Sequence, residues 1–145
     1  MDPDNPVVKL CADGIAAEMA GRPADARAAY ERAWAARTDA FEACVAAHYV
    51  ARHQHTPDDS HRWNAEALAQ ADAAAAAGDD RVRAFYPSLH LNMGHACEVA
   101  GDLAGAARHY SLADARLGDV PAGPYGDVVR HGVAEACRRV AGAMG

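Results

Sequence analysis

Apolar and polar positions do not alternate over any stretch of the chain, and β-branched residues are sparse. Alternation with a period of two is the pattern of a half-buried strand, so we expect no strand. The clearest periodic segment lies near the C-terminus, where a helix over about 127–141 would carry an apolar stripe on one side. The stripe consists of Val128, Val129, Val133, Cys137 and Val140. The pattern predicts an all-α protein that ends in an amphipathic helix.

Prolines, glycines and capping residues divide the chain into seven expected helices. Pro23 and Pro57 suit the first turn of a helix, and Gly21 suits the position just after a helix end. Pro87 falls inside the fifth helix and predicts either a kink or a late start there. The segment 119–126 holds two prolines and two glycines and is expected to be a loop. The expected helices cover about 7–20, 23–37, 39–53, 57–78, 80–101, 102–117 and 127–141.

Composition supports a helical chain with few bulky core residues. The chain has 145 residues, which fits one domain over 1–145. Hydrophobic residues make up 51%, yet only two Trp, two Phe and five Tyr are present, and most of the remainder is alanine. Alanine has the highest intrinsic helix propensity, so tightly packed helix pairs are expected. The net charge of -6 disfavours binding to nucleic acid.

The N-terminal sequence and the cysteine spacing indicate a cytoplasmic protein. No run of 18 apolar residues is present, so we expect no membrane span. The first residues, MDPDNPVVKL, lack the basic and apolar regions of a signal peptide. The four cysteines form no CxxC pair, and free buried thiols are expected in a reducing compartment. Lys9 is the single lysine among 14 basic Lys and Arg residues, which indicates a GC-rich coding genome and a bacterial source.

Two segments of the chain repeat each other at an offset of 80 positions. Each copy contains a glycine, a second glycine seven residues later, then an alanine, a tyrosine and an alanine at intervals of five, four and three. Small residues at these points would let the two helices of a hairpin approach closely. The matched pairs are Gly14 with Gly94, Gly21 with Gly101, Ala26 with Ala106, Tyr30 with Tyr110, and Ala33 with Ala113.

This spacing resembles the tetratricopeptide repeat, a helix–turn–helix unit of about 34 residues. The later copy matches the repeat at Asn92, Gly94, Ala96, Gly101, Asp102, Ala106, Tyr110 and Ala113. His90 replaces the usual tryptophan of that copy, and Leu10 replaces it in the early copy. The resemblance implies a right-handed superhelix of three hairpins, about 7–37, 39–78 and 80–117, closed by a capping helix at about 127–142.

The resemblance also implies a concave groove, because the first helix of each hairpin lines the ligand-binding face in this family. The middle hairpin lacks the repeat glycines, so its frame is placed by analogy. Asn92 matches an asparagine that many members use to hold a peptide backbone or a terminal carboxylate. The basic partners of a carboxylate clamp are not recognisable. The groove residues implied are Glu18, Cys44, His48, Arg52, Ser88, Asn92, His95 and Glu98.

The groove residues could support two kinds of chemistry besides simple packing. Cys44 and His48 lie one helical turn apart and could join Cys11 and His95 in a metal site. A glutamate could instead orient His48 or His95 for acid–base catalysis. No GxSxG elbow, HExxH helix or phosphate-binding glycine loop is present. We therefore expect no catalytic residue, no bound metal and no cofactor.

The resulting expectation is a non-catalytic binding or adaptor module that holds a peptide segment or partner protein in its groove. The alternative is a small-molecule pocket, or an acid–base enzyme, built from the same groove residues. A third hypothesis is a homodimer in which the groove holds a second copy. Trp34 and Trp63 are expected to serve core or inter-repeat packing.

Overall fold

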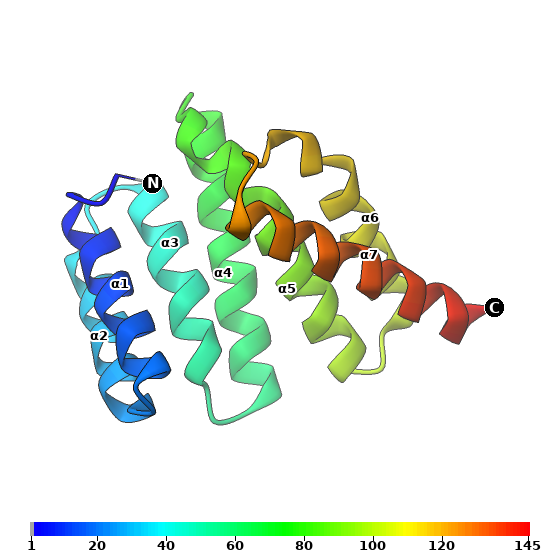
Figure 1. Ribbon diagram of the computed structural model, residues 1–145, viewed down its shortest axis with the longest axis horizontal. Helices are drawn as coiled ribbons and strands as arrows, with labels where there is room; N and C mark the ends of the chain where they lie inside the picture. Colours follow the sequence, from blue (N-terminus) through cyan, green and yellow to red (C-terminus); the bar gives the residue numbers. More distant parts are fainter. Residues whose placement is uncertain (1) are drawn as a thin grey trace. The chain divides into compact units, whose positions relative to one another are not determined.

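The computed structural model describes residues 2–145, and all regular structure in this range is helical (Figure 1). The prediction of an all-α protein with seven α-helices is confirmed. Short 3-10 turns occur at η1 (Ala51–His53), η2 (Asp80–Phe85) and η3 (Leu117–Asp119). The α-helices are α1 (Pro6–Met19), α2 (Pro23–Ala36), α3 (Ala40–Val50), α4 (Pro57–Ala76), α5 (Tyr86–Val99), α6 (Leu103–Ala115) and α7 (Pro124–Met144).

The chain divides into two compact units. The N-terminal unit comprises the described residues up to Asp80 and contains α1 to α4. The C-terminal unit comprises Arg81–Gly145 and contains α5 to α7. A single domain over 1–145 and a right-handed superhelix stay predictions.

The N-terminal unit consists of two helix hairpins, α1–α2 and α3–α4, packed through α3 (Figure 1). Helix starts follow local capping signals: the Asp39 carboxylate accepts from the Glu42 N–H at 2.8 Å, and the Thr56 hydroxyl accepts from the Asp59 N–H at 3.1 Å. Small side chains fill the contacts between helices, which allows close approach of their backbones. The alanines with no exposed surface in this unit are Ala26, Ala33, Ala46, Ala47, Ala67 and Ala71.

The C-terminal unit consists of the α5–α6 hairpin with α7 packed against it (Figure 1). Val129, Val133 and Val140 on α7 are buried as the amphipathic pattern predicted, and Cys137 is half-buried. Val128 was also assigned to the stripe, which is wrong, because its side chain is 71% exposed. The charged and polar residues Asp127, His131, Glu135 and Arg138 are exposed on the opposite side of α7.

Two helix boundaries depend on proline. Pro87 lies in the first turn of α5, so the late start is the correct alternative and the kink is not formed. Pro124 begins α7, so the expected loop over 119–126 ends three residues earlier than predicted. The reason is that proline supplies the backbone φ of a first helical turn and loses no hydrogen bond there. The same residue that indicates a loop can therefore start a helix.

The two segments that repeat at an offset of 80 positions form the same contact in the structure, between a glycine and a tyrosine ring. A Cβ atom added to Gly14 would lie 2.2 Å from Cε1 of Tyr30, and one added to Gly94 would lie 2.3 Å from Cε1 of Tyr110. Each tyrosine ring therefore packs directly on the backbone of the preceding helix of its own hairpin. The predicted close approach of the two helices is confirmed in both hairpins.

Candidate functional site

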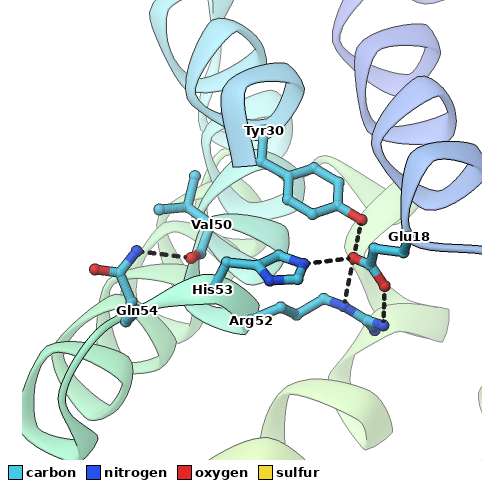
Figure 2. Close-up of polar contacts among 6 residues, drawn as sticks. All are labelled: Glu18, Tyr30, Val50, Arg52, His53 and Gln54. Atoms are coloured by element: carbon cyan, nitrogen blue, oxygen red, sulfur yellow. Dashed lines mark hydrogen bonds and ion pairs between the residues drawn. The ribbon is translucent and has the colours of Figure 1, made fainter. Parts of the chain in front are cut away.

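A polar network in the N-terminal unit contains two of the predicted groove residues, Glu18 and Arg52 (Figure 2). The Glu18 carboxylate accepts from Arg52 Nη2 at 2.6 Å and from Arg52 Nε at 3.1 Å. It also accepts from the Tyr30 hydroxyl, and His53 Nε2 lies 3.0 Å from Glu18 Oε1. The network therefore connects α1, α2 and the 3-10 turn that follows α3.

Glu18 is ionised in this network, and both of its carboxylate oxygens have hydrogen-bond partners. Burial alone would raise its pKa, but hydrogen bonds from Tyr30, Arg52 and His53 outweigh burial and hold the pKa below the ordinary value. The Glu18 side chain is 17% exposed, whereas the Arg52 side chain is 48% exposed. Glu18 therefore supports the packing of helices, and Arg52 is the member of the network that solvent or a ligand can reach.

The C-terminal unit contains a similar network, in which Glu98 and Tyr110 match Glu18 and Tyr30 but the arginine comes from a different position. The Glu98 carboxylate accepts from the Tyr110 hydroxyl, from Arg139 Nη2 at 2.6 Å and from Arg139 Nε at 3.0 Å. The hydrogen bond from Arg139 is the largest influence on Glu98 and, with that from Tyr110, lowers its pKa to about 2. Arg139 belongs to α7, so the network attaches the final helix to the α5–α6 hairpin.

The network itself was not predicted, although part of its signal was present in the sequence. Glu18 and Glu98 are separated by the same 80 positions as the repeat glycines and tyrosines. The resemblance assigned both glutamates to a ligand-binding face. In the structure they bind tyrosine and arginine side chains of their own unit.

Cys44 and His48, which were predicted to line the groove, are both buried. Cys44 has no exposed surface and His48 is 8% exposed. Burial lowers the pKa of His48 to about 4, and the nearby charge of Arg52 acts in the same direction. Burial raises the pKa of Cys44 to about 12, and Asp72 adds to this effect. At neutral pH both groups are therefore uncharged, which is unfavourable for a nucleophile or a general acid.

All four cysteines are free thiols, and Cys11 and Cys44 should be unreactive in the folded protein. Burial raises the pKa of Cys11 to about 12 as it does that of Cys44, so little thiolate forms at pH 8. We expect their reaction with Ellman's reagent to be at least about 100-fold slower than in 6 M guanidinium chloride. The half-buried Cys137 should react first. Rapid modification of Cys44 in the native protein would contradict its burial.

The predicted groove residues of the C-terminal unit have different surroundings. Ser88 is 8% exposed, and its hydroxyl lies 2.5 Å from the hydroxyl of Tyr125. Asn92 is half-buried, and His95 is exposed on α5. Within each unit, Arg52 and His95 are thus the predicted residues most accessible to a ligand.

His90 forms a buried pair that sequence reasoning missed. Its Nδ1 lies 3.1 Å from Nδ1 of His109, and the two side chains belong to α5 and α6. Among residues 2–145, no group of three or more His, Cys, Asp or Glu side chains is arranged to hold a metal ion. The resemblance placed His90 alone at the usual tryptophan position, and we assign the pair to packing within the hairpin.

Trp34 and Trp63 form an aromatic pair on the surface of the N-terminal unit. Their rings meet edge to face, with centroids 5.0 Å apart and planes at 87°. The Arg37 guanidinium lies 3.8 Å from the centroid of the Trp34 ring. The pair connects α2 with α4, in agreement with the expected inter-repeat packing. Both side chains are half-buried and not fully enclosed, so neither is a core residue.

Two surface hollows adjoin this pair. The smaller has a volume of about 230 Å³ and is lined by Trp34, Trp63, Arg62 and Glu66. The larger has a volume of about 400 Å³. Trp34 and Glu66 contribute to both hollows, so the two are adjacent. The larger hollow is lined by Trp34, Arg37, Thr38, Asp39, Ala43, Glu66 and Gln70.

Comparison of the chain with family models, with curated proteins and with solved structures finds no match. In the described part of the chain, no helix has both the length and the apolar character needed to cross a bilayer. The candidate sites therefore depend on geometry alone. They are the two Glu–Tyr–Arg networks and the surface formed by Trp34, Trp63 and Glu66, which we call the tryptophan surface.

Proposed function

We propose that the chain is a non-catalytic binding module of the tetratricopeptide type, which holds a segment of a partner protein. The observation that carries this proposal is the half-buried pair of Trp34 and Trp63 beside two hollows. Tryptophan and arginine are the residues most enriched at the energetic centres of protein interfaces. A surface that presents two indole rings and a stacked guanidinium has the composition of such a centre.

The rigidity of the two similar hairpins also supports the proposal. The Gly14–Tyr30 and Gly94–Tyr110 contacts and the two networks fix the helices within each unit. A surface held on rigid elements loses little conformational entropy when a partner binds. The four free thiols suit a reducing bacterial cytoplasm, which is part of the proposal.

The groups that could perform chemistry give less support to an enzyme. His48 is buried and its pKa is lowered by burial, while Glu18 and Glu98 hold arginine side chains within the fold. A general acid or base must reach its substrate and titrate near the working pH. We therefore propose binding rather than catalysis, with Arg52 and His95 as additional polar contacts.

Selection of random linear peptides displayed on phage, with the full chain immobilised, tests the proposal. We expect enriched peptides that bind the wild-type chain and lose at least about tenfold in affinity for the Trp34→Ala/Trp63→Ala double variant, since interface tryptophans are frequent hot spots. Circular dichroism should establish that the double variant keeps its helical content.

Val128→Ala is the matched control, because Val128 is an exposed apolar residue in the C-terminal unit. This variant should bind the selected peptides as the wild type does. Failure to enrich any peptide would overturn the proposed function. Peptides that bind the double variant as tightly as the wild type would remove its supporting observation.

A further inference from the structure

Glu66 is the charged residue that lines both hollows of the tryptophan surface. It lies one turn after Trp63 on α4. Its Oε1 accepts from Gln70 Nε2 at 3.0 Å. Within residues 2–145, no arginine, lysine or histidine forms an ion pair with it, and its side chain is half-buried. A partly buried carboxylate of this kind gains more from a positive partner than a fully solvated one does.

The indole rings beside Glu66 favour a cation. The Arg37 guanidinium already lies over Trp34 at 3.8 Å, so this surface accommodates a stacked cation. Trp63 lies at 87° to Trp34 and lines the smaller hollow together with Glu66. Two aromatic walls and a carboxylate in one hollow are the groups that bind an ammonium or guanidinium ion.

The remaining charges do not reverse this preference. Arg62 also lines the smaller hollow, but its guanidinium already pairs with the Asp59 carboxylate at 2.7 Å. Arg37 is exposed, stacks on Trp34 and donates to the Trp34 carbonyl oxygen at 2.7 Å. Water solvates the exposed Arg37 better than the half-buried Glu66. An ion pair with a ligand should therefore stabilise the Glu66 carboxylate more than the Arg37 guanidinium. The net charge of -6 also favours the approach of a basic segment.

We infer that the tryptophan surface takes a basic segment of the partner protein, with an arginine or lysine side chain in the smaller hollow. The charged end of that side chain pairs with Glu66, and its apolar stem contacts Trp34 and Trp63. This inference rests on the proposed function and adds the chemistry of the partner to it. In this arrangement Glu66 positions the cation, and Trp34 and Trp63 provide most of the contact area.

Titration of the full chain with acetylated, amidated tetraarginine tests the inference. Trp34 and Trp63 are the only two tryptophans, so their indole N–H signals in a ¹H–¹⁵N spectrum report on this surface directly. We expect both signals to shift. Glu66→Gln should keep the bond to Gln70 and raise the dissociation constant about five- to tenfold, as loss of a charged partner does. Trp63→Ala should also weaken binding.

Three controls separate specific recognition from attraction to an acidic protein. Tetracitrulline has nearly the same shape without the charge and should shift neither signal. Tetraglutamate should shift neither, and binding of tetraglutamate in place of tetraarginine would overturn the inference. Asp114→Asn removes one exposed negative charge from the C-terminal unit, which contributes no residue to the tryptophan surface. It should change the dissociation constant less than twofold, because solvent screens exposed charges.

The inference is also overturned if tetraarginine moves neither indole signal, or if Glu66→Gln binds it as well as the wild type. Peptide selection distinguishes this failure from failure of the proposed function. Selected peptides that need Trp63 but contain no basic residue would keep the binding module and remove its basic partner. If no peptide is selected and tetraarginine shifts neither signal, both proposals fail.

Discussion

Replacing Gly94 with alanine is expected to destabilise the C-terminal unit by about 1–3 kcal/mol, the usual cost of overpacking a filled site. The new Cβ would lie 2.3 Å from Cε1 and 2.5 Å from Cδ1 of Tyr110, well inside contact distance. Tyr110 is 1% exposed and its hydroxyl bonds to Glu98, so the ring has little freedom to move aside. The net loss already includes the gain in helix propensity of alanine over glycine, about 1 kcal/mol. Urea unfolding followed by circular dichroism measures the effect.

Two further substitutions complete this test. Gly14→Ala should cause a similar loss in the N-terminal unit, because its Cβ would lie 2.2 Å from Cε1 of Tyr30. Gly142→Ala in α7 is the matched control, since nothing lies within 4 Å of its added Cβ. There, helix propensity alone should stabilise the protein by up to about 1 kcal/mol. If Gly94→Ala behaved like Gly142→Ala, the tyrosine would not pack on the helix backbone.

The sequence was sufficient for the helices and for the close approach of helices in the two repeated hairpins, because these signals are local or repeated. Proline and glycine mark helix ends through their own backbone geometry, whatever the rest of the fold does. The recurrence of Gly14 and Tyr30 as Gly94 and Tyr110 indicated two similar hairpins, but not that each tyrosine ring packs on the glycine of its own hairpin. The start of α7 was misplaced because Pro124 fits both a loop and a first helical turn.

The polar networks could not be predicted in full, because the arginine is not part of the repeat. Arg52 follows Glu18 by 34 positions, whereas Arg139 follows Glu98 by 41. The difference arises because α7 replaces the next hairpin and follows a different connection. A resemblance placed each glutamate on a helix face, but it contained no information on which cation would reach it.

The tryptophan surface depends on tertiary structure in the same way. Trp34 and Trp63 come from α2 and α4 and meet only once both hairpins are packed. Sequence spacing therefore indicated that the rings pack between hairpins, but not how much of each ring stays exposed. Exposed area separates a core aromatic from an interface residue, and it depends on all neighbouring side chains.

Acidification is expected to weaken the C-terminal unit through Glu98. The pKa of Glu98 is lowered from an ordinary 4.5 to about 2 in the folded state, chiefly by Arg139. Stabilisation from a lowered pKa is fully present above the value of the unfolded chain and is lost as pH falls toward the folded value. The loss should therefore occur between about pH 5 and pH 2. Because solvent around the half-exposed Arg139 screens the pair, we expect about 1–2 kcal/mol.

Comparison of the wild type with Glu98→Gln isolates this contribution. At pH 7 the variant should be less stable, because Arg139 and Tyr110 lose their charged acceptor. Between pH 5 and pH 3 its stability should fall less than that of the wild type, since it has no carboxylate to protonate at this position. Glu135→Gln removes an exposed carboxylate that pairs with Arg138 on the same helix, and should change stability by less than about 0.5 kcal/mol. Equal pH dependence of Glu98→Gln and the wild type would mean that Arg139 does not hold a charged Glu98, and the attachment of α7 would then depend on its other contacts, chiefly its buried apolar residues.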